Sequence, residues 1–393
     1  MSVQHITVLG ATGSVGVNTL DVIARHPDRY AVFALTANTQ RDVLLEQCKQ
    51  HNPVYAVLAD DMSAEQFRQD VRAAGLAVEV MTGQESLAFV ASHPQVTCVM
   101  AAIVGFAGLP PVLAAARAGK KILLANKESL VCAGHLLMQS VREAGGTLIP
   151  IDSEHSAIFQ CLPQDRPLLQ AGVEQLVLTA SGGPFRDWDR HALQGVTPEQ
   201  ACTHPNWKMG RKISVDSATM MNKGLELIEA CWLFDTTPAH VGVVVHPQSI
   251  VHSMVQYRDG SVLAQLGEPD MRTPIAFGLA WPDRIAAGVP RLDLARLATL
   301  TFFDLDDDRF PAVSLARQAF DAGSGIATAM NAANEVAVAA FLARQLPFTH
   351  IVALVAKVMR LLGRVVPPTD FQSVLAIDQE ARGLALAEVA SYG

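Results

Sequence analysis

A glycine-rich loop joins the first apolar run of this chain to its first helical pattern. The apolar run ends at Leu9, residues 10–16 read GATGSVG, and helical apolar spacing follows over Val15–Arg25. Glycines allow backbone N–H groups to approach a pyrophosphate, and the N-terminus of a helix favours its negative charge. The succession of strand, loop and helix therefore predicts a dinucleotide-binding domain. The alternative for the loop is a tight turn that binds no ligand.

Short apolar runs alternate with helical patterns through the first 150 residues. A second helix is predicted over Arg41–Gln50. The runs predicted to form strands are His5–Leu9, Tyr30–Thr36, Tyr55–Ala59, Cys98–Val104 and Lys121–Ala125. Apolar strands separated by helices indicate a parallel sheet that is covered on both faces. The fold class is therefore α/β, with an N-terminal Rossmann-type domain over residues 1–150.

The end of the second predicted strand indicates which dinucleotide would bind. An NAD site usually places Asp or Glu there, where the carboxylate binds the ribose hydroxyls. Residues 37–41 read ANTQR, which contains no carboxylate and ends at Arg41. Because an acid would repel a 2′-phosphate and Arg41 would attract it, this stretch favours NADPH over NADH. The alternative for Arg41 is a solvated side chain at the start of a helix.

The pattern of apolar residues changes after residue 150. Asp259-Gly260 separates two predicted strands and is a strong signal for a hairpin. The predicted strands of this part are Gln175–Ala180, Gly242–Val245, His252–Tyr257 and Val262–Leu266, and the later predicted helices are Ala312–Ala322, Ile326–Ala343 and Ile351–Leu362. We therefore expect a catalytic α+β domain over residues 151–285, a linker over 286–311 and a C-terminal α-helical domain over 312–393.

The composition excludes several classes of protein. Half of the 393 residues are hydrophobic and 17% are charged, so general disorder is excluded. The formal net charge of −8 argues against a nucleic-acid-binding protein, which needs a basic face. The longest uncharged stretch includes Cys98–Ala116, whose glycines and prolines would break a membrane-spanning helix. We expect no secretory signal and no membrane partner, and a cytoplasmic protein with six reduced cysteines.

Four carboxylates are candidates for a metal site. In extended backbone, Asp152 and Glu154 would point to the same side, because alternate residues share a face. Carboxylate oxygens suit a hard cation such as Mg²⁺ or Mn²⁺. Glu226 and Glu229 lie one turn apart on a predicted helix, Leu225–Leu233, and either would complete a set of three carboxylates. The alternative is that these are exposed surface charges.

Lys127 lies two residues beyond the predicted strand Lys121–Ala125. In an open parallel sheet, ligands bind beyond the carboxyl ends of the strands. Lys127 would therefore hold a polarised oxygen of a substrate or relay a proton. The alternative is a solvated ion pair between Lys127 and Glu128 at the end of a strand.

Later segments offer hydrogen-bond donors suited to a phosphate group. Ser181 precedes two glycines at the end of a predicted strand, an arrangement that can cradle a phosphate through backbone N–H groups. Ser217, Asn222 and Lys223 add side-chain donors within one polar run. The sequence therefore predicts a phosphorylated substrate.

A long irregular segment, about residues 182–212, separates these two groups of donors. Segments of this length are usually functional or mobile, so we predict a mobile lid. Trp207 within it would shield the substrate from water when the lid closes. The alternative for His204, in the same segment, is an ordinary loop histidine.

Taken together, these motifs resemble the 1-deoxy-D-xylulose 5-phosphate reductoisomerase family. The resemblance runs from the glycine loop to the C-terminal helices. The segments that carry it are Leu124–Ser129, Pro150–His155, Thr179–Arg186, His204–Trp207, Ser217–Glu226 and His246–Ser249. It implies an enzyme that uses NADPH and a divalent cation to rearrange and reduce 1-deoxy-D-xylulose 5-phosphate to 2-C-methyl-D-erythritol 4-phosphate, a step of non-mevalonate isoprenoid biosynthesis.

The resemblance also assigns roles to individual residues. It implies three metal ligands, Asp152, Glu154 and Glu226, which with Lys127 form the catalytic group. The implied substrate contacts are Lys127, Ser153, Ser181, His204, Ser217, Asn222 and Lys223, together with the metal ligands Glu154 and Glu226 and the predicted lid residue Trp207. The implied NADPH contacts are Thr12, Gly13, Ser14, Val15, Asn38, Asn126, Glu128 and Gly210, to which the sequence adds Arg41.

The sequence departs from the family in one place, because Asn38-Thr39-Gln40 stands where members often carry Gly-x-Asn after the second strand. The family is homodimeric, and the strand-rich region 246–266 would support a shared sheet. Two other functions are kept as alternatives. One is an NADP-dependent semialdehyde dehydrogenase, which needs a nucleophilic cysteine, and the other is a non-catalytic NADPH-binding protein.

Overall fold

The computed structural model describes residues 3–392 except 164–167, 169, 205 and 208. Its internal contacts divide the chain into two compact units. The first comprises Met1–Ser129, Leu137–Asp152 and Asp270–Pro290, and the second comprises Leu130–Leu136, Ser153–Pro269 and Arg291–Gly393. This division places residues 270–290 in the first unit and the C-terminal helices with the second sheet, whereas the sequence predicts three domains.

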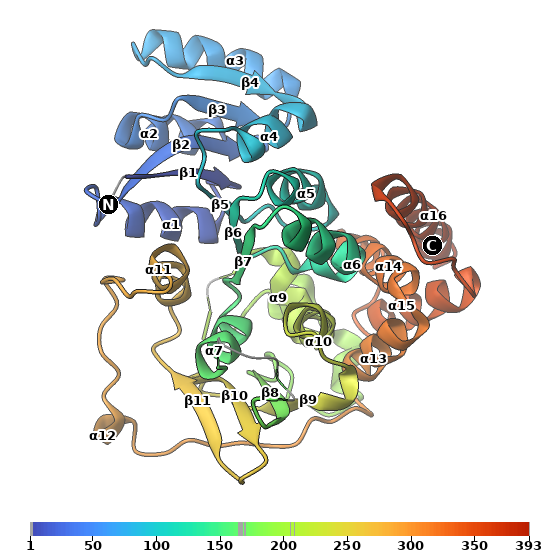
Figure 1. Ribbon diagram of the computed structural model, residues 1–393. Helices are drawn as coiled ribbons and strands as arrows, with labels where there is room; N and C mark the ends of the chain where they lie inside the picture. Colours follow the sequence, from blue (N-terminus) through green and yellow to red (C-terminus); the bar gives the residue numbers. More distant parts are fainter. Residues whose placement is uncertain (1–2, 164–167, 169, 205, 208, 393) are drawn as a thin grey trace. The chain divides into compact units, whose positions relative to one another are not determined.

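The first unit is built on a seven-stranded sheet of order β4-β3-β2-β1-β5-β6-β7, in which every neighbouring pair is parallel (Figure 1). The strands are β1 (Gln4–Leu9), β2 (Tyr30–Ala37), β3 (Tyr55–Leu58), β4 (Glu79–Thr82), β5 (Cys98–Ala101), β6 (Lys121–Leu124) and β7 (Thr147–Pro150). All five strands predicted for this part are confirmed. The short β4 and β7 were not predicted, and β5 ends at Ala101 rather than Val104.

Helices connect these strands as parallel pairing requires. They are α1 (Ser14–Ala24), α2 (Arg41–His51), α3 (Asp61–Ala73), α4 (Gly83–Ser92), α5 (Leu109–Arg117), α6 (Lys127–Glu143) and α11 (Arg272–Ala280). Helix α11 comes from far along the chain, yet it packs beside α1 and contacts β6 and β7. Buried side chains of α1, α2, α3 and α11 form one continuous apolar core with buried side chains of the strands.

The strand order of this sheet changes direction between β1 and β5. At such a switch point the loops after the two strands leave the sheet on opposite sides and open a crevice for ligands. Here the loop after β1 starts at Gly10, where an added Cβ would lie 2.7 Å from the carbonyl oxygen of Ala102, just after β5. The first glycine therefore allows the loops after β1 and β5 to approach each other closely.

The second unit contains a four-stranded sheet of order β11-β10-β8-β9. Its strands are β8 (Val173–Ala180), β9 (Val241–Val245), β10 (Val251–Tyr257) and β11 (Val262–Leu266). Strands β8 and β9 are parallel, whereas β10 runs antiparallel to both β8 and β11. The predicted hairpin at Asp259-Gly260 is confirmed between β10 and β11, where Gly260 adopts a φ of +86°.

Helices make up the remainder of the second unit. They are α7 (Ser153–Cys161), α8 (Pro198–Ala201), α9 (Arg211–Ala218), α10 (Met221–Leu233), α12 (Leu294–Leu297), α13 (Ala312–Ala322), α14 (Ser324–Leu342), α15 (His350–Leu362) and α16 (Phe371–Ala390). Helix α14 lies at the centre of the C-terminal group, in contact with α9, α13, α15 and α16. The three predicted C-terminal helices are confirmed, and α16 was not predicted.

Helix α14 is also long and apolar enough to cross a membrane by length and composition alone. However, 78% of its apolar window is buried inside the unit, as is usual for the central helix of a folded core. In the described part of the chain no other helix meets the same criteria, so the finding is weak evidence for a membrane span.

Candidate active site

The glycine loop of the first unit adopts a conformation that two of its glycines require. Gly10 has a φ of +81°, and its N–H donates to Oγ1 of Thr36 at 2.8 Å. A Cβ added at Gly16 would lie 2.4 Å from the carbonyl oxygen of Gly10. Helix α1 begins at Ser14, and within the described residues no side chain caps its N-terminus and no acid lies in its first turn. The positive end of this helix is therefore suited to an anion.

The other residues predicted to bind the cofactor on this side lie around the loop. Gly13 and Ser14 are exposed, and Thr12 and Val15 are half-buried. Asn38 is exposed beyond the end of β2. Arg41 begins α2 and lies 3.6 Å from a carboxylate oxygen of Asp70.

Asn126 joins the ends of two neighbouring strands. Its Nδ2 donates to the carbonyl oxygens of Ile103 at 2.5 Å and Gly105 at 2.9 Å, both beyond β5. Its Oδ1 accepts from the N–H of Ser129 and so caps α6. Because Asn126 is 1% exposed, this predicted cofactor contact also stabilises the loop after β5.

Lys127 follows Asn126 and is 5% exposed, as is Glu128. The alternative of a solvated Lys127–Glu128 pair is therefore wrong. The ammonium group of Lys127 instead pairs with the carboxylate of Asp152. This contact forms because β6 and β7 are adjacent parallel strands, and the segments that leave their carboxyl ends meet at one edge of the sheet.

The extended conformation expected for Asp152-Ser153-Glu154 is wrong, because the start of a helix lies within these residues. Helix α7 begins at Ser153, so Ser153 and Glu154 lie in its first turn and Asp152 precedes it. The residues that follow, His155 to Ile158, are buried, and an acid in the first turn stabilises a helix. Asp152 and Glu154 remain neighbours because two residues span at most about 7 Å.

One ammonium group binds two carboxylates in the second unit. Nζ of Lys223 lies 2.8 Å from Oε1 of Glu154 on α7, and it also pairs with Glu226 on α10. Nδ2 of Asn222 donates to the other oxygen of Glu226. Burial alone would lower the pKa of Lys223, but the carboxylates of Glu154 and Glu226 outweigh it and raise that pKa.

The structure distinguishes the two glutamates of α10. Both are fully buried, so the alternative of exposed helix charges is wrong. Glu226 shares Lys223 with Glu154, whereas Glu229 lies 3.3 Å from Nδ1 of His155. Nε2 of the same imidazole lies 2.8 Å from the carbonyl oxygen of Glu226. Glu226 therefore faces Glu154, whereas Glu229 faces the imidazole of His155.

Ser181 lies at the end of β8, before two glycines with positive φ. Gly182 and Gly183 have φ values of +81° and +69°. The N–H of Gly183 donates to Oγ of Ser181 at 3.2 Å. A Cβ added at Gly183 would lie 2.8 Å from the carbonyl oxygen of Ser217, so this loop packs directly on the last turn of α9. The segments that carry Ser181 and Ser217 are therefore adjacent.

His204 is held in one tautomer by its neighbours. Its Nδ1 accepts from the backbone N–H groups of Asn206 at 3.2 Å and Trp207 at 3.0 Å. Nδ1 is therefore unprotonated, and Nε2 carries the hydrogen that is donated to Oγ of Ser181 at 2.9 Å. Burial lowers the pKa of His204 to about 4, against a smaller opposing influence of Glu154.

The segment 182–212 is less irregular than predicted, because α8 and the first residues of α9 lie within it. Nδ2 of Asn206 donates to the carbonyl oxygen of Pro247 at 2.6 Å and to Oγ of Ser249 at 3.0 Å. Trp207 is half-buried, with its ring 6.2 Å from the ring of His252. Gly210 caps the N-terminus of α9.

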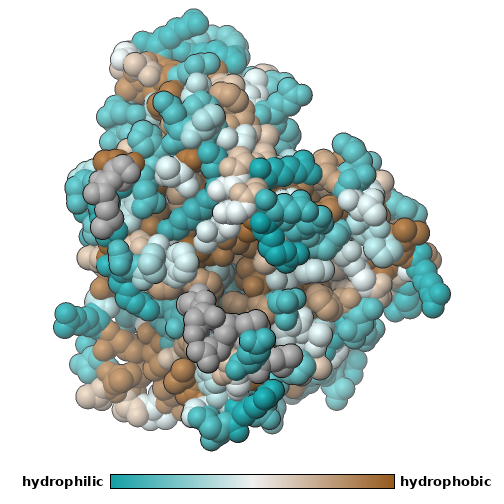
Figure 2. Space-filling model, in the orientation of Figure 1, coloured by the Kyte–Doolittle hydropathy of each residue, from teal (hydrophilic) through white to brown (hydrophobic). Residues whose placement is uncertain are grey.

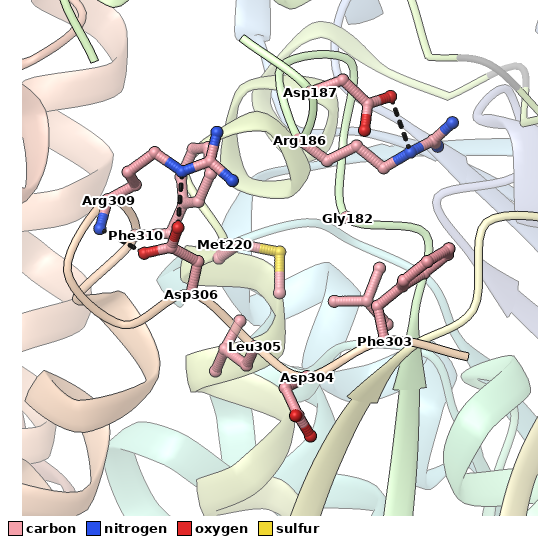
Figure 3. Close-up of a pocket in the computed structure, with 11 residues that line it drawn as sticks. Gly182, Arg186, Asp187, Met220, Phe303, Asp304, Leu305, Asp306, Arg309 and Phe310 are labelled. Carbon is pink, nitrogen blue, oxygen red and sulfur yellow. Dashed lines mark hydrogen bonds and ion pairs between the residues drawn. The ribbon is translucent and has the colours of Figure 1, made fainter. Parts of the chain in front are cut away.

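A cavity of about 190 Å³ lies behind the Ser181 loop, lined by Gly182, Arg186, Met220, Phe303 and Phe310, among others (Figure 3). Nη1 of Arg186 donates to the carbonyl oxygen of Ser181 at 3.3 Å. The predicted substrate contacts do not line this cavity. Four of its charged groups form two ion pairs, which Figure 3 shows as Arg186 with Asp187 and Arg309 with Asp306. Of the residues that line it, Arg186 contributes to the Ser181 loop through its hydrogen bond to Ser181.

The cysteines offer little support for a nucleophilic thiol. Burial raises the pKa of Cys48, Cys98 and Cys231 to about 12, and it also raises the pKa of Cys161. These four thiols are therefore protonated at neutral pH and are poor nucleophiles. This weakens the alternative of a semialdehyde dehydrogenase.

Three residues that support the site were not identified from the sequence. Thr36 holds Gly10, His155 connects α7 to α10, and His252 packs against Trp207. Thr36 is a polar residue within an apolar strand, which is a signal that could have been used. His155 directly follows the acidic pair, but its partner on α10 is 71 residues away and carries no local signal.

Three family models match consecutive parts of the chain. The 1-deoxy-D-xylulose 5-phosphate reductoisomerase model matches residues 6–134, the C-terminal domain model of the same family matches 148–234, and a DXP reductoisomerase C-terminal domain model matches 266–384. A 1-deoxy-D-xylulose 5-phosphate reductoisomerase of Pseudomonas fluorescens (strain Pf-5) is 59% identical, with 98% of this chain and 97% of the relative covered. That of Pseudomonas putida (strain W619) is 58% identical over 100% and 99% of the two chains.

Solved structures agree with these matches. A DOX-P reductoisomerase crystallised in complex with NADPH, fosmidomycin and magnesium has a TM-score of 0.96 and 46% identity, covering 99% of this chain and 98% of its own. The Zymomonas mobilis reductoisomerase in complex with NADPH has a TM-score of 0.90 and 46% identity, with 99% of both chains covered. On sequence and fold together, the chain belongs to the 1-deoxy-D-xylulose 5-phosphate reductoisomerase family.

Proposed function

We propose that this protein converts 1-deoxy-D-xylulose 5-phosphate to 2-C-methyl-D-erythritol 4-phosphate, with NADPH as reductant and a divalent cation as cofactor. Membership of the reductoisomerase family supports the reaction, and a structural relative was crystallised with NADPH and magnesium. The observation that carries the proposal is the buried contact of Lys223 with both Glu154 and Glu226. This arrangement gathers oxygen ligands and phosphate donors in one place.

The carboxylates fit a divalent cation. Glu154 and Glu226 bring two negative charges to the single positive charge of Lys223, so the cluster keeps an attraction for cations. Asp152 precedes Glu154 by two residues, and carboxylate oxygens are the ligands that Mg²⁺ and Mn²⁺ prefer. We therefore assign Asp152, Glu154 and Glu226 as metal ligands. When bound, the cation would polarise the substrate carbonyl and stabilise negative charge that develops on oxygen.

Lys127 supplies a second positive group to the reaction. It is buried and already paired with Asp152, so its ammonium group is held in one place before the substrate binds. A buried, oriented ammonium can donate a hydrogen bond or a proton to an oxygen that gains negative charge. We assign this role to Lys127, and a substrate contact to Ser153 at the start of α7.

The phosphate of the substrate is assigned to the donors around Ser181 and Ser217. His204 is neutral and presents its Nε2–H toward this place, so it donates without adding a charge. Asn222 and Lys223, at the start of α10, add an amide and an ammonium group. Binding energy from the phosphate, which does not react, orients the reacting carbons. Trp207 would exclude water as the segment around it closes.

NADPH is assigned to the glycine loop and its neighbours. The N-terminus of α1 would bind the pyrophosphate through backbone N–H groups. Arg41 would approach the 2′-phosphate. The further contacts proposed are Thr12, Gly13, Ser14, Val15, Asn38, Asn126, Glu128 and Gly210.

We further propose a homodimer formed through the edge of the second sheet. Strand β11 is an edge strand, and its Val262 and Leu263 are 50% and 48% exposed. Figure 2 shows apolar side chains gathered on the surface over the β10–β11 hairpin. An edge strand with exposed apolar residues is suited to pairing with a second chain. Sedimentation equilibrium of the protein and of a Leu263→Lys variant would test this, since the variant is expected to shift toward the monomer.

The experiment that tests the function is an NADPH oxidation assay with 1-deoxy-D-xylulose 5-phosphate, before and after treatment with EDTA and after Mg²⁺ is restored. We expect activity that EDTA abolishes and Mg²⁺ restores. Activity that a thiol reagent abolishes and EDTA leaves unchanged would favour the semialdehyde dehydrogenase. NADPH binding without any turnover would favour the non-catalytic alternative. We expect the active protein in the cytoplasm.

A further inference from the structure

The C-terminal helices hold a buried carboxylate on α9. Asp216 is 1% exposed, and its Oδ1 accepts a hydrogen bond of 2.8 Å from Nδ2 of Asn334, a fully buried residue of α14. The other oxygen of Asp216 lies 2.8 Å from Nζ of Lys212 at the start of α9. Hydrogen bonds to a charged group are strong in a buried site. Asp216 therefore connects α9 to α14 at the centre of the C-terminal helices, and it also pairs with the first turn of its own helix.

The last turn of α9 carries Ser217, and it packs on the Ser181 loop without an intervening side chain. A Cβ at Gly183 would lie 2.8 Å from the carbonyl oxygen of Ser217 and 3.1 Å from Cα of Ala218. The backbones of the loop and the helix are thus in direct contact. A small displacement of α9 would change the distance between Ser181 and Ser217.

The amide of Asn334 does little for its own helix. Its Oδ1 has no hydrogen-bond partner among the described residues, while its Nδ2 donates across to α9. A buried oxygen without a partner costs stability, and an apolar pair of similar volume would often be at least as stable. The polar pair instead fixes the position of α9 along α14, because a hydrogen bond requires one relative position of the two helices. Apolar packing would allow α9 to slide along α14.

We propose that Asn334 is a positioning residue which, through Asp216, places Ser217 against Ser181 so that both donate to the phosphate of the substrate. This inference rests on the proposed function, which assigns the phosphate to Ser181 and Ser217. It extends the substrate site to a residue of the C-terminal helices that touches neither substrate nor cofactor.

The test compares Asn334→Ala with Asn331→Ala in the full-length protein. Asn331 is equally buried on α14, but its Nδ2 donates within its own helix to Glu335 at 3.1 Å. For Asn334→Ala we expect KM for 1-deoxy-D-xylulose 5-phosphate to rise about tenfold, the loss of one hydrogen bond to a charged group, while Kd for NADPH is unchanged. For Asn331→Ala neither constant changes. An unchanged KM in Asn334→Ala, or an equal rise in both variants, overturns the proposal.

A double-mutant cycle separates this role from a loss of stability. If Asn334 acts through Ser217, the KM of Ser217→Ala combined with Asn334→Ala rises by less than the product of the two single effects. An effect equal to that product overturns the proposal.

The exchange variant Asp216→Asn with Asn334→Asp keeps the pair and reverses its donor, so we expect it to restore KM. This variant also serves if Asn334→Ala does not fold, and failure to restore KM contradicts the role. A wild-type protein that does not oxidise NADPH with this substrate refutes the proposed function, and the inference with it.

Discussion

The glycine loop of the first unit and the carboxylate cluster of the second unit are proposed to bind ligands by different physical means. The loop offers backbone N–H groups and a helix N-terminus, and three of its seven residues are glycines that have no Cβ. The cluster uses buried side-chain charges from α7 and α10, and its central contact joins Lys223 to Glu154 across 69 residues of sequence. A backbone site is therefore sensitive to added volume, whereas a site of buried charges is sensitive to the loss of one charge.

The largest effect is expected on turnover, when a carboxylate of the cluster is removed. Glu226→Gln keeps the volume of the side chain and removes one negative charge, so we expect turnover to fall by about a hundredfold or more at saturating Mg²⁺. Kd for NADPH should not change, and binding of Mn²⁺, followed by its electron paramagnetic resonance, should weaken. Glu229→Gln, which also removes a buried carboxylate from α10, is the control. Turnover like that of the wild type would contradict the assignment of Glu226.

The next largest effect is expected at the glycine loop. A Cβ at Gly16 would overlap the carbonyl oxygen of Gly10, whereas at Gly13 its nearest neighbour would lie at 3.5 Å. We expect Gly16→Ala to lower the free energy of unfolding by about 1–3 kcal/mol and to weaken NADPH binding. Gly13→Ala should weaken NADPH binding with little change in stability. Chemical denaturation measures the loss of stability, and a fluorescence titration measures NADPH binding. If Gly16→Ala and Gly13→Ala lose the same amount of stability, the close contact at Gly16 does not explain the loss.

A smaller effect is expected for Arg41. If its guanidinium binds the 2′-phosphate, Arg41→Ala should raise KM for NADPH about tenfold and leave KM for NADH unchanged. The lost ion pair with Asp70 is partly exposed and is expected to change the free energy of unfolding by about 0–1 kcal/mol. Steady-state kinetics with both cofactors measure the ratio of KM for NADPH to KM for NADH. If this ratio is the same in Arg41→Ala as in the wild type, Arg41 forms only its ion pair with Asp70 and does not bind the 2′-phosphate.

Trp207→Ala is expected to raise KM for the substrate several-fold, since the lid would close less completely, with kcat less affected. The variant also loses the contact with the ring of His252. A His252→Ala control shows how much of the change comes from that contact. Unchanged kinetic constants for Trp207→Ala would show that the tryptophan serves packing only.

The effect that is smallest at neutral pH is a dependence of stability on pH that originates at His204. Its folded pKa of about 4 lies below the ordinary value of 6.5, so between these values the unfolded chain binds a proton that the folded chain does not. His204 therefore lowers stability progressively as pH falls from about 6.5 to about 4, and has no effect above that range. Unfolding curves of the wild type and His204→Asn, compared across this range, measure the contribution. Parallel curves would contradict the neutral tautomer.

Local patterns predicted much of the fold. Strands β1, β2, β3, β5 and β6 were identified because strands buried on both faces read as continuous apolar runs. The elements that were missed include helices α3, α4, α6, α11 and α16 and the short strands β4 and β7. The conformation of Asp152-Ser153-Glu154 was mistaken, because three residues do not reveal whether the next six form a helix.

The sequence by itself determined five strands of the first sheet, the glycine loop and the family of the protein, since each depends on residues that are close together along the chain. Only the tertiary structure decided that Glu226 rather than Glu229 faces Glu154, that His204 is neutral, and that Asn334 reaches Asp216. The physical reason is that hydrogen bonds and burial are set by residues brought together from distant segments. Residue types along the chain indicate which charges are present, whereas packing decides which of them meet.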